Sequence, residues 1–342
     1  MATQNFNLNP ANQRAAHDTL AVSPDGSIIV AGPRFLPTNG LLVVDWASSS
    51  SYVLEHPEPD VLVTEAALST DGSTLALVVT RPLFFGVSEI WLTDPSGNVR
   101  DIIGQPRRSL RYPAFSPGGD RLAFFQDIDG DRFRIAPNLR EAMTYSVFEM
   151  ALDTREVQAR TSSAYAALCG IFYLDDSIYY CAAAPMERLN DGTYVFEHSP
   201  STLRGEDVRF PNHRLVPTLR DNQADEPVDR SGLLVGVSRS GSLLLSRGVQ
   251  ARTDPSCTAV LVDADGAERQ LAHPPGRVCH FAVSADGTTV AGLGYDSVAF
   301  TPTTSRLVVW RSGTIVFDAL FSELQTGTPR QLQQREGASA TR

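Results

Sequence analysis

The 342-residue sequence contains no lysine, and all 29 of its basic residues are arginine. Acidic residues number 39, so the formal net charge is −10 at pH 7. Nucleic-acid binding requires an excess of Lys and Arg facing the phosphates, and this composition therefore argues against DNA or RNA as a partner. Codon bias and selection against reactive amines are two explanations for the missing lysine, and neither identifies a function.

Long apolar runs and closely spaced cysteines are missing as well. No segment approaches the roughly 20 apolar residues of a membrane-spanning helix, and Met1 to Leu20 lacks the basic-then-apolar pattern of a signal peptide. The chain is too long to depend on disulfides. Its four cysteines, none in a C-x-x-C pair, are Cys169, Cys181, Cys257 and Cys279. With 42% hydrophobic residues, the sequence predicts a globular, cytoplasmic protein with reduced thiols and no membrane span.

What the sequence does contain is a repeated pattern of an apolar strand, a serine, a turn bearing Asp or Gly, and a second apolar strand. Five copies are LAVSPDGSIIVAG from Leu20, AALSTDGSTLALV from Ala66, PAFSPGGDRLAFF from Pro113, VGVSRSGSLLLSR from Val235 and FAVSADGTTVAGL from Phe281. A sixth, IFYLDDSIYYCAA from Ile171, keeps the pattern without the serine. Self-similarity at a fixed period of this kind indicates a repeat fold.

Each copy can be divided into four short strands. In the first copy they are expected at Thr19–Ser23, Ile28–Gly32, Leu41–Trp46 and Ser51–Glu55. The Asp-Gly pair between the first two strands tolerates the positive φ that tight hairpins require. Four strands in about 45 residues, with no amphipathic helix between them, predict a β-propeller blade. We therefore expect an all-β, six-bladed β-propeller of four-stranded antiparallel blades.

The expected organisation is a lead-in over 1–18, one propeller over 19–320 and a polar, disordered tail over 321–342. The blades are expected near 19–56, 61–103, 111–162, 166–215, 230–273 and 278–320.

The S-P-D-G turn between an aromatic or aliphatic strand and an L-A-F-type strand resembles the repeat of TolB-type propellers. The same repeat occurs in the N-terminal domains of prolyl oligopeptidase-like and tricorn-like proteases. The resemblance covers about Thr19 to Leu320, and it implies a propeller that binds other proteins or gates a protease domain. The prolyl-peptidase branch would need a further hydrolase domain with a G-x-S-x-G motif, and we expect this chain to lack it because only 321–342 follows the last copy.

The segments between the second and third strands are expected to be long and to share one face with the connection 198–227, while the opposite face carries tight turns. Long loops in a compact domain are usually functional. Arginine beside aromatic residues is a composition enriched at protein interfaces. The predicted partner-binding residues are Arg34, Phe35, Arg81, Phe84, Phe85, Arg107, Arg108, Arg132, Phe133, Arg188 and Phe300, with Arg111 beside the basic pair. The alternative is that these side chains fold back onto the blades.

One acidic segment is a candidate calcium site. Asp127, Asp129 and Asp131 alternate around Gly130, as the carboxylates of oxygen-ligand calcium loops do. The segment lacks the glutamate of an EF-hand, and an Asp-rich hairpin tip is the alternative.

The mouth of the central channel is a second candidate site. His17, Glu65, Tyr112 and His280 lie near the starts of first strands, which a closed propeller brings together. They would bind a metal or a small anion there, unless the histidines are ordinary loop residues. No nucleophile–base pair, Walker A loop or dinucleotide-binding motif can be assigned.

These patterns favour a non-catalytic docking propeller, monomeric in isolation, that binds another protein through its long loops and uses no cofactor apart from the calcium candidate. The alternative is a propeller enzyme, a lyase or hydrolase, with its site at the channel mouth. A polar pocket with perturbed pKa values at the mouth would favour the enzyme. A contiguous apolar patch on the outer loops would favour docking.

Overall fold

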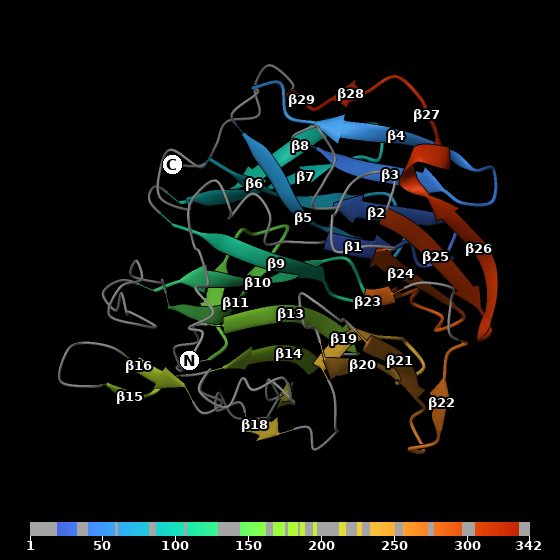
Figure 1. Ribbon diagram of the computed structural model, residues 1–342. Coiled ribbons are helices and arrows are strands. Elements are labelled where there is room, and N and C mark those ends of the chain that lie inside the picture. The colour runs from blue at the N-terminus through green and yellow to red at the C-terminus, as the bar shows by residue number, and fades with distance from the viewer. Residues whose placement is uncertain are drawn as a thin grey trace, which may run out of the picture.

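The protein is all-β apart from one short 3-10 helix among the residues described by a computed structural model (Figure 1). The structure describes residues 19–32, 40–58, 61–81, 87–105, 108–128, 144–161, 167–174, 177–183, 185–188, 194–196, 212–216, 224–227, 233–249, 256–272, 277–295 and 305–334. Within these ranges no helix is long and apolar enough to cross a membrane.

Five sheets are built from four consecutive antiparallel strands each. The first contains β1 (Thr19–Val22), β2 (Ile28–Gly32), β3 (Leu41–Asp45) and β4 (Ser50–Glu55), and the second contains β5 (Leu62–Leu68), β6 (Leu75–Thr80), β7 (Ser88–Thr93) and β8 (Asn98–Ile103). The third contains β9 (Leu110–Phe115), β10 (Arg121–Asp127), β11 (Tyr145–Ala151) and β12 (Val157–Ala159). The last two contain β19 (Leu233–Val237), β20 (Leu243–Val249), β21 (Ser256–Val262) and β22 (Glu268–Gln270), and β23 (Arg277–Val283), β24 (Thr289–Tyr295), β25 (Ser305–Arg311) and β26 (Thr314–Leu320).

A further four-stranded sheet is interrupted in sequence. It pairs β13 (Ala167–Leu174), β14 (Ser177–Ala183), β17 (Asn212–Val216) and β18 (Ala224–Pro227), with a separate hairpin of β15 (Pro185–Arg188) and β16 (Tyr194–Phe196) between its second and third strands. We expected 198–227 to be a connection, which is wrong for β17 and β18. Both strands are short and polar, so only their pairing in the sheet, such as Leu215 opposite Ile178, identifies them.

The first strands of these sheets form a closed ring. Contacts run from β1 to β5, β9, β13, β19, β23 and back to β1. Apolar clusters fill the spaces between neighbouring sheets; one of them joins Ile29 and Val44 of the first sheet to Leu293 and Val309 of the last. The prediction of an all-β propeller with four-stranded antiparallel blades is confirmed. Five blades have the regular strand order, where we expected six.

The serine of the repeat explains the first-to-second turns. In the first blade the Ser23 hydroxyl donates to the Asp25 carboxylate at 2.6 Å and accepts the Ile28 N–H at 2.8 Å. Gly26 has a φ of +73° and its N–H bonds to the Ser23 carbonyl, so the turn needs a residue without a Cβ. Equivalent hydroxyl-to-carboxylate bonds join Ser69 to Asp71, Ser116 to Asp120 and Ser284 to Asp286.

The segment after the last blade forms a clasp along the outer rim. It consists of a 3-10 helix (Phe321–Glu323), β27 (Gln325–Thr326), β28 (Arg330–Gln331) and β29 (Gln333–Gln334). Strands β27 and β28 pair in parallel with β4, and β29 pairs in parallel with β8. The clasp therefore runs from the last blade over the outer edges of the first two, as Figure 1 shows at the top of the view.

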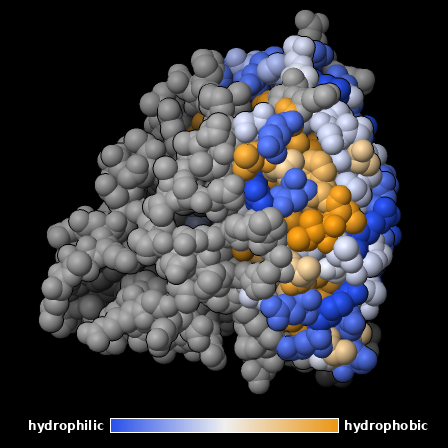
Figure 2. All heavy atoms as spheres, turned by 45° about the vertical axis from the view of Figure 1, so that its right-hand side comes forward, coloured by the Kyte–Doolittle hydropathy of each residue, from blue (hydrophilic) through white to orange (hydrophobic). Residues whose placement is uncertain are grey.

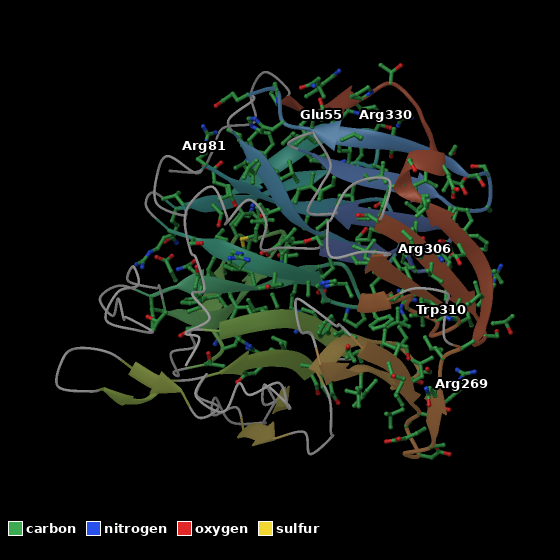
Figure 3. The ribbon with its side chains drawn as sticks, in the orientation of Figure 1. Glu55, Arg81, Arg269, Arg306, Trp310 and Arg330 are labelled. Carbon is green, nitrogen blue, oxygen red and sulfur yellow. The ribbon has the colours of Figure 1, made fainter. Side chains whose placement is uncertain are left out.

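Side chains anchor this clasp. Leu332 is 2% exposed and packs in the cluster between the first and second blades. The Arg330 guanidinium lies 3.7 Å from the centre of the Tyr52 ring, and the Gln331 amide donates to the Glu55 carboxylate at 3.0 Å; Figure 3 shows Arg330 and Glu55 together at the rim. Our expectation of a disordered tail from 321 onward is wrong for 321–334, because its few apolar residues are buried by the blades. Residues 335–342 lie outside the described part.

Candidate functional site

The first strands surround a cavity of about 440 Å³ along the propeller axis. Its walls are largely apolar, and its polar lining includes Thr19, Glu65, Tyr112, Arg239 and His280. We call the side where first strands begin and second strands end the loop face, because each segment joining a second to a third strand starts and finishes there. We call the side of the Ser-x-Asp-Gly turns the turn face.

The first strands are bulged near the loop face in five of the six sheets. In β5, for example, Val63 pairs with Val79 and Glu65 with Val78, which leaves Thr64 as an extra residue. The other shifts fall in β9, β13, β19 and β23. A bulge redirects the side chains that follow it and is over-represented beside functional sites. The repeated bulges therefore give the channel mouth a geometry that strand alternation alone would not produce.

Glu65 is the centre of a buried polar cluster at this mouth. The residue is 3% exposed. Its Oε1 pairs with the guanidinium of Arg111, and its Oε2 accepts the backbone N–H of Tyr112. Both oxygens of this second-blade carboxylate are thus held by the third blade. Tyr112 has a φ of +50°, a left-handed conformation that costs energy for a residue with a Cβ.

The environment of this cluster shifts the pKa values of its members. Burial raises the pKa of Tyr112 to about 12, although the Arg111 charge opposes this rise. Burial likewise raises the pKa of Tyr145. For Arg111, burial alone would lower the pKa, but the Glu65 carboxylate outweighs it and the pKa is raised. At neutral pH the mouth therefore presents protonated phenols beside a paired Glu–Arg couple.

At the turn-face end of the channel, Arg239 reaches across the axis. The side chain comes from the turn after β19, and Nη2 donates to the carbonyl of Thr70, after β5, at 3.2 Å. The Arg239 N–H donates to the Ala285 carbonyl at 2.6 Å. Sequence reasoning missed this residue. The sequence did contain a signal for it. Arg239 directly follows the repeat serine, and the other four serine-containing copies have Pro, Thr or Ala at that position.

The predicted channel-mouth residues are partly brought together. Glu65, Tyr112 and His280 line the same cavity, whereas His17 lies outside the described residues.

Of the predicted partner-binding residues, Arg81, Arg108 and Arg188 fall in the described residues. Arg81 follows β6 at the loop face and pairs with Glu58 at 3.4 Å. Arg108 precedes β9 and donates to the Asp127 carbonyl at 3.2 Å. Arg188 ends β15. The other predicted residues, Arg34, Phe35, Phe84, Phe85, Arg107, Arg132, Phe133 and Phe300, lie outside the described part of the chain.

The acidic segment is described only at its first residue. Asp127 is 8% exposed, and its carboxylate accepts the Ser109 N–H at 2.6 Å. This bond ties the end of β10 to the start of β9. Asp129 and Asp131 lie outside the described residues, and the described side chains include no group of three or more His, Cys, Asp or Glu that could hold a metal. The calcium site stays a prediction.

No protein-family model matches the sequence, and no curated protein matches it. Solved structures do match in fold. TolB from Acinetobacter baumannii has a TM-score of 0.54 at 15% identity, over 88% of this chain and 62% of the TolB chain. Hydrazine synthase from Kuenenia stuttgartiensis has a TM-score of 0.50 at 14% identity, over 86% and 82% of the two chains.

An oligogalacturonate lyase in complex with manganese has a TM-score of 0.48 at 15% identity, over 86% of this chain and 74% of the lyase. In the comparison with TolB, this chain spans less than two thirds of the length of the TolB chain. At such identities the likeness concerns architecture, and architecture does not determine chemistry. The protein is a β-propeller with the fold of TolB-type propellers.

Proposed function

We propose that this protein is a non-catalytic docking module that binds a partner protein at its loop face, around the mouth of the central channel. The observation that carries the proposal is the difference in side chains between the two faces of the propeller. Arg81 and Arg108 lie at the loop face, while four first-to-second turns at the turn face are closed by their own serine and aspartate side chains. Arginine is a common anchor in protein interfaces.

The mouth is a polar site with shifted pKa values, as a propeller enzyme would have, but its carboxylate is not available as a general base. A general base needs a free carboxylate or imidazole within reach of substrate, whereas both oxygens of Glu65 are engaged by Arg111 and Tyr112. The raised pKa of Tyr112 keeps its hydroxyl protonated at neutral pH. The half-buried Tyr112 ring, held beside the Glu65–Arg111 pair, would therefore offer a fixed aromatic surface to a partner at little conformational cost.

The described surface has few large exposed apolar side chains. Val157 and Val316 are the exposed large hydrophobic residues in the described part, at 40% and 45%. Figure 2 shows apolar side chains between hydrophilic ones on the side that carries the C-terminal strands. We propose that the predicted loop residues such as Phe84 and Phe85, which lie outside the described residues, supply the apolar anchors of the docking surface.

A propeller enzyme acting at the channel mouth is the second candidate. The convergence of Glu65, Tyr112 and His280 on one cavity favours it. Turnover that disappears in Tyr112→Phe and His280→Gln variants of unchanged stability would favour the enzyme over the docking module.

We also propose that the interrupted sheet counts as a sixth blade, and that the protein is monomeric and cytoplasmic. The closed sequence of contacts through β13, between β9 and β19, supports the blade count. The −10 net charge favours a soluble monomer, since like-charged copies repel.

The docking proposal is tested by affinity purification from the organism that encodes the chain, with Phe84, Phe85 and Arg132 replaced singly by alanine. Truncating an interface anchor typically costs about 2 kcal/mol, roughly 30-fold in affinity. We expect at least one variant to lose the partner while its thermal melting is unchanged. Matched controls on the turn face are Asp25→Ala and Asp286→Ala. Retention of the partner by all three loop variants, or its loss in the controls, would show that another surface binds it.

A further inference from the structure

Arg239 gives the channel a charged floor at the turn face. In the ring order β1, β5, β9, β13, β19, β23, the strand that precedes Arg239 lies three positions from β5. The side chain therefore crosses the axis to the opposite blade, where Nη2 reaches the Thr70 carbonyl at 3.2 Å. Arg239 and Thr70 both line the cavity, together with Pro24, Pro117 and Ala285.

Arg239 brings a guanidinium to the turn-face end of the cavity. Its hydrogen bonds go to and from backbone groups, and no described carboxylate forms an ion pair with it. Glu65, the acid that lines the cavity, belongs to the other end and is paired with Arg111. The aspartates of the adjoining turns are engaged within their own hairpins, as Asp71 is by Ser69 and Ser73. The turn aspartates stay ionised, since hydrogen bonds lower the pKa of Asp25 and Asp71. None of the described ones pairs with Arg239, so its guanidinium is the group lining this end of the cavity that can bind an anion.

The walls between this floor and the mouth are apolar. They include Ala66, Leu68, Ala114, Val237, Ala282 and Val283. The cavity volume of about 440 Å³ lies in the range of small-molecule sites, roughly 300–1,000 Å³. An apolar cavity with a guanidinium at its turn-face end suits a molecule with an apolar body and one anionic end.

We propose that the central channel is a binding site for a small organic carboxylate, with its apolar body along the first strands and its carboxylate on Arg239. A guanidinium has five N–H donors in a planar fork that matches a carboxylate in two-point contact. The bond to Thr70 uses one of these donors and orients the fork. The proposal goes beyond partner docking at the loop face, and it is tested on the purified protein alone.

The probe is decanoate, titrated calorimetrically into the full-length protein below the concentration at which decanoate forms micelles. We expect one bound decanoate per chain and weaker binding of uncharged decanamide. Arg239→Gln is expected to weaken decanoate binding about tenfold or more and to leave decanamide binding unchanged. The matched control is Arg269→Gln, since Arg269 lies on β22, the outermost strand of the same blade and away from the axis (Figure 3). It should bind decanoate like the wild type.

A second variant covers the case in which Arg239→Gln does not fold. Arg239→Lys keeps the charge but lacks the planar guanidinium fork, and it should retain part of the affinity for decanoate. The preference of the wild type for decanoate over decanamide is an independent readout. The proposal is overturned if decanoate does not bind, if decanamide binds as tightly, or if Arg239→Gln binds decanoate like the wild type. Because no partner protein is present, these outcomes leave the docking proposal unaffected.

Discussion

Replacement of Glu65 by glutamine tests whether the buried ion pair ties the second blade to the third. The substitution removes the charge that compensates the Arg111 guanidinium and leaves one oxygen to serve two donors, Arg111 and the Tyr112 N–H. Breaking one side of a buried pair typically costs about 3–5 kcal/mol. The Arg111 side chain keeps 18% exposure, so water partly solvates the freed charge and we expect the lower end, about 3 kcal/mol.

The assay is urea unfolding at neutral pH, followed by tryptophan fluorescence, with thermal melting in parallel. At about 2 °C per kcal/mol for a chain of this size, the melting temperature should fall by roughly 6 °C. The matched control is the double variant Glu65→Gln with Arg111→Met, which removes both charges and should recover most of the lost free energy of unfolding. A loss below about 1 kcal/mol in the single variant, or a double variant no more stable than the single one, would refute a buried pair that joins the blades.

Three further outcomes concern the clasp, the turns and the cysteines. Leu332→Ala should lower the free energy of unfolding by about 2 kcal/mol and speed amide exchange in β4 and β8; unchanged exchange would contradict a clasp that protects these edges. Hydrogen bonds from Ser69 and Ser73 lower the pKa of Asp71 to about 2, so its contribution to stability is present above about pH 4 and is lost as the pH falls toward 2. When the free energy of unfolding in urea is plotted against pH, Asp71→Asn should flatten the curve over this range. An unchanged slope there would contradict a stabilising role for these hydrogen bonds. The intact mass under non-reducing conditions should match four free thiols. A mass lower by two hydrogen atoms would indicate a disulfide and overturn the proposed cytoplasmic location.

The sequence was sufficient for the features that depend on neighbouring residues. The hairpin of Ser23 to Ile28 needs only a hydroxyl, a carboxylate and a glycine at short spacing. The second strand expected at Ile28–Gly32 occurs at those bounds as β2. The hairpin and the strand are both local and repeat along the chain, so pattern reasoning detects them.

Features that depend on ring closure were not predictable in this way. The clasp is polar and lacks strand periodicity, and it becomes ordered because Phe321, Leu324 and Leu332 enter clusters formed by distant blades. The same holds for the channel. The position of Glu65 suggested the mouth, but its partners in the next blade come from a bulged register, and the reach of Arg239 to Thr70 requires the opposite blade to be in place.

The central claim, that a partner docks at the loop face, is tested most directly by site-specific photo-crosslinking from the two ends of one strand. Arg81 follows β6 at the loop face, and exposed Ser73 precedes the same strand at the turn face. A photoreactive phenylalanine is placed at either position, and extract of the organism that encodes the chain is irradiated with the purified variants. The docking account predicts one discrete protein crosslinked from position 81 and absent from position 73. Crosslinking from position 73 alone would contradict it.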